Sequence, residues 1–223
     1  FVSRAKKDGP VLLFTGGLHG DEINGIEIVR RLIDGDLCKP DKGTVIAMPI
    51  VNVYGFIQNV RGVPDGKDIN RSFPGIKGGS LARLLAYVLM NEVLPHVDYG
   101  VDFHSGGASR ANFPQVRCTF NEHINLKLAK AFGAPVTLNS SLISKSFRWA
   151  AQKKGKTVIV YETGESMRMD EKGIEIAIDG SRRLMQHLNM LQSRELYHAQ
   201  TEIYKKSRWV RARNAGIFQP KFE

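Results

Sequence analysis

The stretch VLLFTGGLHGDE, residues 11–22, joins a short apolar run to a glycine-rich turn that carries a histidine and two acidic residues. The run from Val11 to Thr15 predicts a buried β-strand. The residues that follow predict a helix, because apolar side chains recur at helical spacing and Gly35 is typical of a C-terminal stop. These apolar residues are Ile23, Ile26, Val29, Leu32 and Ile33. A strand, a tight turn and an amphipathic helix in this order are typical of an α/β fold.

The rest of the chain repeats this alternation. Apolar or β-branched runs predict further extended segments at 44–51, 99–103, 135–138 and 157–161. Helical periodicity predicts a helix that Ser80 begins and Pro95 ends, and others at 124–132, 146–154 and 174–191. Strands that alternate with helices predict an α/β fold with a mixed, largely parallel sheet.

Composition narrows the classes of function. The 223 residues carry a formal net charge of +10, but the basic residues are scattered in short clusters without a known nucleic-acid module, so nucleic-acid binding is not expected. Two distant cysteines, Cys38 and Cys118, favour a reducing compartment over a disulfide framework. No run of 18 apolar residues is present, so no membrane span is expected. We therefore expect a cytoplasmic globular protein.

Four polar residues lie near the predicted carboxyl ends of strands. His19 and Glu22 follow the first strand, His104 follows the strand at 99–103, and Glu162 follows the strand at 157–161. Ligands of α/β sheets gather at this edge, and a catalytic zinc ion commonly has two histidines and one glutamate as ligands. Each residue alone also has a structural interpretation: a surface histidine, a buried histidine held by an acid, or a carboxylate that caps a helix.

Two further segments add to this pattern. Strand alternation places Asp102 on the same face as His104, where a carboxylate often orients a metal-binding imidazole. The segment DINRSFPG, residues 68–75, contains Asn70 and Arg71, and an arginine can bind a carboxylate through two parallel hydrogen bonds. The alternative for this segment is a turn that Asp and Asn side chains stabilise.

HGDE, DINRSFPG, DFHSGG and ETG, in this order, resemble the motifs of the succinylglutamate desuccinylase/aspartoacylase family, an offshoot of the zinc carboxypeptidases. The resemblance runs from about residue 11 to 165. It implies a single α/β catalytic domain of zinc-carboxypeptidase type, with a mixed, largely parallel central sheet flanked by helices. This domain would span residues 1–207, and residues 208–223 would begin the family's small C-terminal β-domain, the rest of which would lie outside these 223 residues.

The resemblance also implies roles for individual residues. His19, Glu22 and His104 would bind one Zn²⁺ per chain, and Glu162 would be the general acid/base, with Glu165 as a rival. Asn70 and Arg71 would hold a substrate carboxylate. Arg61 would match a family arginine that polarises the scissile carbonyl.

We therefore expect a zinc-dependent hydrolase that cleaves the amide bond of an N-acyl amino acid or a similar small carboxylate. One alternative is a metallocarboxypeptidase that acts on peptides. Another is a non-catalytic protein that binds a metal or ligand, although such a protein commonly loses one of these residues. The expected partner is a small anionic N-acyl substrate, with no nucleic acid and no membrane, and the sequence leaves homo-oligomer formation open.

Overall fold

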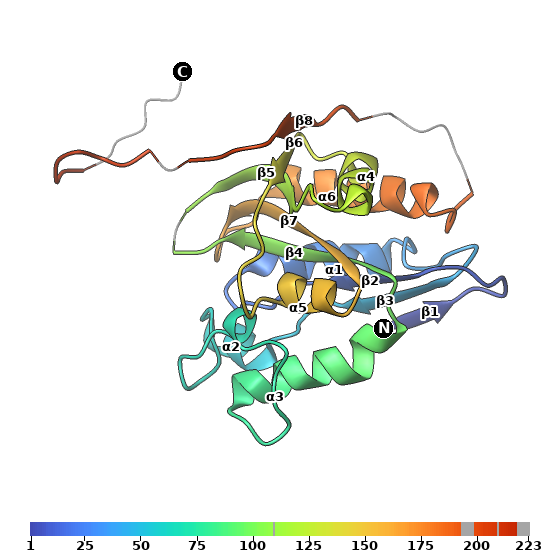
Figure 1. Ribbon diagram of the computed structural model, residues 1–223, viewed down its shortest axis with the longest axis horizontal. Coiled ribbons are helices and arrows are strands. Elements are labelled where there is room, and N and C mark those ends of the chain that lie inside the picture. Colours follow the sequence, from blue (N-terminus) through green and yellow to red (C-terminus); the bar gives the residue numbers. More distant parts are fainter. Residues whose placement is uncertain (109, 193–198, 209, 218–223) are drawn as a thin grey trace.

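The computed structural model describes residues 1–108, 110–192, 199–208 and 210–217. Its described part contains one eight-stranded sheet with the strand order β1-β3-β2-β4-β7-β5-β6-β8 (Figure 1). The strands are β1 (Val2–Arg4), β2 (Val11–Thr15), β3 (Thr44–Met48), β4 (Tyr99–Gly106), β5 (Asn112–Cys118), β6 (Val136–Asn139), β7 (Thr157–Glu165) and β8 (Glu202–Tyr204). Pairing is parallel except between β1 and β3 and between β5 and β7, so the sheet is mixed and largely parallel, as predicted.

Helices cover both faces of the sheet (Figure 1). On one face lie α1 (Ile23–Asp34), α4 (His123–Phe132) and α6 (Glu171–His187), and α6 contacts both α1 and α4. On the other face lie α3 (Leu81–Val88) and α5 (Phe147–Lys153). The short helix α2 (Val53–Gln58) and a 3₁₀ turn at Ile69–Arg71 belong to the long loop after β3, and a π turn (Leu89–Val93) and a 3₁₀ turn (Leu94–His96) follow α3.

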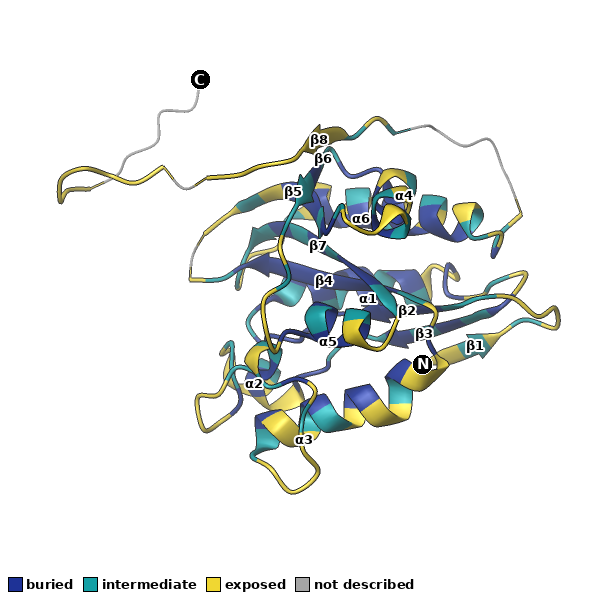
Figure 2. Cartoon of the chain, viewed as in Figure 1, coloured by how far each residue is buried: buried dark blue, intermediate teal, exposed yellow. Residues whose placement is uncertain are grey.

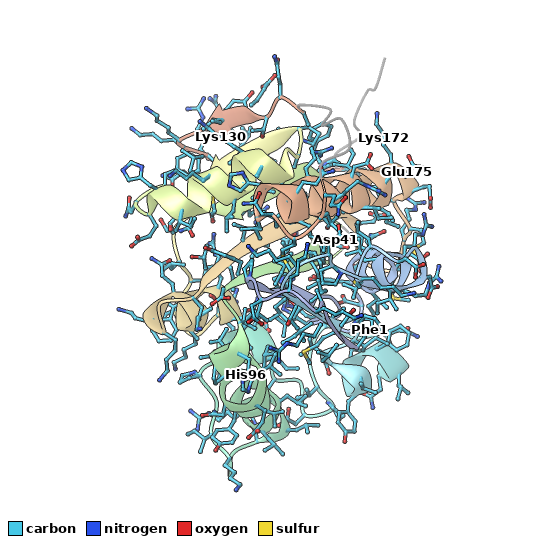
Figure 3. The ribbon with its side chains drawn as sticks, turned by 90° about the vertical axis from the view of Figure 1, so that its right-hand side faces the viewer. Phe1, Asp41, His96, Lys130, Lys172 and Glu175 are labelled. Atoms are coloured by element: carbon cyan, nitrogen blue, oxygen red, sulfur yellow. The ribbon has the colours of Figure 1, made fainter. Side chains whose placement is uncertain are left out.

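The core has two parts because successive strand residues point to opposite faces of the sheet. Leu12 and Phe14 of β2 pack in the cluster under α1, α4 and α6, whereas Leu13 packs in the cluster under α3 and α5. Figure 2 shows the central strands and the inner helix faces as buried, and the edge strand β8 and the outer helix faces as exposed. Charged side chains such as Lys130 of α4 and Lys172 and Glu175 of α6 project outward (Figure 3). The helices are therefore amphipathic, as their apolar spacing predicts.

The predicted helices and strands are confirmed, with shifts at their ends. The strand predicted at 44–51 ends at Met48, and the helix predicted at 174–191 begins at Glu171 and ends at His187. The strands β1, β5 and β8 and the helix α2 were not predicted from the sequence. Within the described part of the chain, every helix is too short or too polar to span a lipid bilayer.

Two strands are longer than predicted. β4 continues past Phe103 to Gly106, and β7 continues past Tyr161 to Glu165. The two strands pair with each other in this region, with His104 opposite Glu162. Hydrogen bonds between the strands extend them past their apolar residues, and a prediction from one apolar run cannot include this pairing. His104 and Glu162 therefore lie within strands and not after them, which corrects the predicted placement.

The predicted start of a C-terminal β-domain at 208–223 stays a prediction. Residues 210–217 are exposed and contain no helix or strand. Trp209 and residues 218–223 lie outside the described residues.

Candidate metal centre

Close backbone packing brings the first turn of α1 against the sheet. A Cβ atom added at Gly25 would lie 2.4 Å from the Phe103 carbonyl oxygen, and one added at Gly16 would lie 2.3 Å from the Gly25 carbonyl oxygen. Only glycine permits such an approach. The approach matters because Glu22, the residue just before α1, then reaches His104 on β4.

Glu22 lies between the two histidines. Its Oε1 atom is 2.7 Å from His19 Nδ1, and its Oε2 atom is 2.8 Å from His104 Nδ1. The exposed fractions of His19, Glu22 and His104 are 2%, 2% and 4%. One nitrogen or oxygen atom from each residue lies within 4.8 Å of the others. The three predicted metal ligands therefore converge on one buried point.

The second nitrogen of each imidazole contacts an aspartate. His104 Nε2 is 2.7 Å from Asp102 Oδ2, and His19 Nε2 is 3.2 Å from Asp68 Oδ1. The other oxygen of Asp102 accepts a hydrogen bond of 2.7 Å from the Thr15 hydroxyl. Carboxylates in this position fix the proton on Nε2 and leave Nδ1 as the ligand atom. The predicted contact between Asp102 and His104 is present, whereas the contact of Asp68 with His19 was not foreseen.

The donor set fits a metal ion. His19 Nδ1 is buried, and among the described residues it has no partner with full hydrogen-bond geometry, although Glu22 Oε1 lies 2.7 Å away. Buried polar atoms normally have a partner, and a cation shared with Glu22 and His104 would provide one. Two imidazole nitrogens and one carboxylate oxygen are also the protein ligands of many catalytic zinc sites. The interpretation of His19 as a surface histidine is excluded by its burial.

Charge around this point favours an ionised Glu22. Burial alone raises the pKa of a carboxyl group, but the neighbouring His19 and His104 hold the pKa of Glu22 well below its ordinary value. Arg61 lies beside it: Nη1 donates to Glu22 Oε1 at 3.1 Å, and Nε donates to Asp68 Oδ2 at 3.1 Å. The Arg61 side chain is 41% exposed, so it lies at the edge of the site.

Glu162 is brought next to the three candidate ligands by the pairing of β4 with β7. Asn112 Nδ2 donates to its Oε2 atom at 2.8 Å, and Arg117 Nη1 lies 3.5 Å from its Oε1 atom. Burial raises the pKa of Glu162 above its ordinary value, and the charges of His104 and Arg117 oppose that rise. The rival Glu165 instead forms an ion pair with Arg168 and does not line the cavity described below.

The segment that begins at Asp68 is both a turn stabilised by side chains and a part of the cavity wall, so it agrees with both interpretations of its sequence. The turn is stabilised locally, because Asp68 Oδ1 accepts from Asn70 N at 2.7 Å and Arg71 Nη1 donates to the Asn70 carbonyl at 2.6 Å. Asn70 Oδ1 accepts from Phe147 N at 2.8 Å, which leaves its amide nitrogen for other contacts. Asn70 and Arg71 also lie in the wall of the same cavity as the histidines.

This cavity has a volume of about 600 Å³, and all seven predicted site residues line it. Its wall also contains Asn112, Arg117 and Arg148, which were not predicted as site residues from the sequence. Arg148 is 8% exposed, and its buried Nη1 atom has no hydrogen-bond partner within the described chain. One signal for Arg117 was present, since Gln115 and Arg117 alternate with Val116 and Cys118 as in a half-buried strand.

Comparison with known sequences identifies related proteins. The profile of the succinylglutamate desuccinylase/aspartoacylase catalytic domain matches residues 8–188. The N-alpha-acetyl-L-2,4-diaminobutyric acid deacetylase of Halomonas elongata is 32% identical over 183 residues, which are 75% of this chain and 54% of that protein. The chain thus spans about half the length of this relative.

Solved structures show the same fold. A succinylglutamate desuccinylase/aspartoacylase from Rhodobacter sphaeroides superposes with a TM-score of 0.79 at 28% identity, over 91% of this chain and 64% of that one. The product-bound ectoine utilization protein EutE (DoeB) from Ruegeria pomeroyi superposes with a TM-score of 0.83 at 26% identity, over 93% and 65% of the two chains. With its motifs, its sheet and its matched residues 8–188, the chain belongs to the succinylglutamate desuccinylase/aspartoacylase family.

Proposed function

We propose that this chain is a zinc-dependent hydrolase that cleaves the amide bond of an N-acyl amino acid or a similar small carboxylate. The observation that carries the proposal is the convergence of His19 Nδ1, His104 Nδ1 and Glu22 in one cavity that also contains Glu162. A ligand set with a neighbouring proton acceptor is what metal-assisted amide hydrolysis requires. The deacetylase name of the Halomonas elongata relative supports the same reaction class.

The proposed roles follow from where the side chains lie. A zinc ion held by His19, Glu22 and His104 would lower the pKa of a water molecule and polarise the amide carbonyl. Glu162 would take a proton from the attacking water and deliver it to the leaving amine. Burial raises its pKa above the ordinary value for a glutamate, which favours a group that must both accept and donate a proton.

Positive charge in the cavity wall supports an anionic substrate. The wall contains five arginines, namely Arg61, Arg71, Arg110, Arg117 and Arg148, against three carboxylates. Arg71 would bind the substrate carboxylate and Asn70 would donate to it through its amide nitrogen, which would fix the acyl bond near the metal ligands. Arg61, which already contacts Glu22, would stabilise the oxyanion as its charge develops.

The test uses the purified chain with zinc added and with zinc removed. We expect about one zinc per chain, and hydrolysis of some members of a panel of N-acetyl and N-succinyl amino acids that stops when a chelator removes the metal. Peptide substrates in the same assay address the carboxypeptidase alternative. Cleavage of peptides alone would support that alternative, and tight zinc binding without turnover of any substrate would support a non-catalytic protein.

A further inference from the structure

We propose that Asn112 and Arg117 of β5 are positioning residues that hold the Glu162 carboxylate in one orientation. The inference rests on the proposed function, in which Glu162 transfers the proton. It adds to that function two residues that no catalytic motif of the sequence contains, since both lie between DFHSGG and ETG.

The register of β5 against β7 places Arg117 correctly for this role. The strands are antiparallel, with Gln115 opposite Glu162 and Arg117 opposite Val160. Because side chains alternate along a strand, Gln115 and Arg117 share one sheet face with Val160 and Glu162. Arg117 Nε also donates to Gln115 Oε1 at 3.4 Å, which directs the guanidinium along this face toward Glu162 Oε1.

A β-bulge brings Asn112 onto the same face. The register shifts by one residue between Gln115 and Asn112, which lies opposite Gly164. Under strict alternation Asn112 would point to the opposite face from Gln115, but the extra residue turns it toward Glu162. Bulges beside active sites often redirect a side chain in this way. Asn112 Nδ2 then donates to Glu162 Oε2 at 2.8 Å.

Each oxygen of Glu162 thus lies next to a different nitrogen donor. The side chain is largely buried, and a carboxylate with one donor per oxygen cannot rotate without losing a contact. Since a displacement of about 1 Å in a catalytic group can lower the rate about 100-fold, we expect removal of one donor to lower kcat about 10- to 100-fold.

The first experiment compares Asn112→Leu with wild type, both loaded with zinc, on a substrate from the panel above. Leucine has a similar size but no hydrogen-bond donor in its side chain. If Asn112→Leu does not fold, Asn112→Ala is used instead. We expect a lower kcat with KM, zinc content and Tm near wild type. Arg117→Lys should retain more activity than Arg117→Met. The matched control is Phe113→Ala, in the same bulge, because Phe113 is 65% exposed and does not line the cavity.

A second measurement separates positioning from general support of the fold. If Asn112 acts through Glu162, then Asn112→Leu should cause no further loss in a Glu162→Gln background, because the two effects are coupled. An equal loss in both backgrounds, an unchanged kcat, or an effect on KM alone would overturn the proposal.

Failure of the proposed function gives a different result. If the wild-type chain cleaves no N-acyl amino acid, crystal structures of the wild type and of Asn112→Leu still test the positioning. The positioning role is supported if the Glu162 carboxylate has one conformation in the wild type and is rotated, or has two conformations, in the variant. A carboxylate that is unmoved in the variant overturns it.

Discussion

Replacement of Asp102 by asparagine tests whether the buried carboxylates beside the histidines support metal binding. Asp102 has both oxygens occupied, one by His104 Nε2 at 2.7 Å and the other by the Thr15 hydroxyl at 2.7 Å. Asparagine has almost the same shape, so packing should not change. One of the two oxygens becomes an NH₂ group, however, and the negative charge beside the imidazole is lost.

The two orientations of the new amide set the size of the effect. If its oxygen faces His104, only the charge is lost, and a charge-assisted hydrogen bond becomes a neutral one at a cost of about 1 kcal/mol. If its nitrogen faces His104, the Nε2 proton meets a second donor, and the ring is driven to the tautomer that protonates the ligand atom Nδ1. Losses of such supporting carboxylates typically weaken metal binding about 10- to 100-fold, or about 1.4 to 2.7 kcal/mol.

The assay is a competition for zinc between the chain and a chromophoric chelator at fixed pH. We expect a zinc Kd that is about 10- to 100-fold higher for Asp102→Asn than for wild type. The control is Asp98→Asn, because Asp98 is exposed just before the same strand and its side chain accepts a hydrogen bond from Val11 N. A zinc Kd within twofold of wild type for Asp102→Asn, or an equal loss in the control, would refute the reasoning.

Three other predictions concern catalysis, specificity and alkaline stability. Glu162→Gln should lower turnover about 10²- to 10⁴-fold with zinc retained in metal analysis; loss of zinc would instead make Glu162 a ligand. Arg71→Lys should lower kcat/KM for free-carboxylate substrates more than for their uncharged amide analogues, and an equal effect on both would contradict its role. Burial raises the pKa of the Cys38 thiol to about 12 and that of Cys118 to about 11. The associated stability is present below the ordinary thiol pKa near 9 and is lost as pH rises toward those values, so urea unfolding should show lower stability at pH 10.5 than at pH 8. The loss of stability between pH 8 and pH 10.5 should be smaller in Cys38→Ala, and an equal loss in that variant would mean that other titrating groups cause it.

Much of the candidate metal centre could be predicted because local sequence patterns determine where its residues lie. The apolar run before Gly16 predicts the strand, and the amphipathic residues after Glu22 predict the helix, so their junction is fixed within a few residues. The contact of Asp102 with His104 follows from the two-residue period of one strand and requires no knowledge of the rest of the fold. The resemblance of the four motifs then identified which segments of the chain come together at the site.

The parts that were missed depend on which strands become neighbours. Asp68 reaches His19 only through the path of the long loop after β3, which has no periodic pattern. β5 was missed because Pro114 interrupts its apolar alternation, and proline is unfavourable within most strands. The same interruption coincides with the bulge that directs Asn112 toward Glu162. A departure from regular strand pattern that weakens a prediction from sequence can thus itself be part of a functional site. For this chain, the irregular strand between two recognised motifs is where mutagenesis has the most to add.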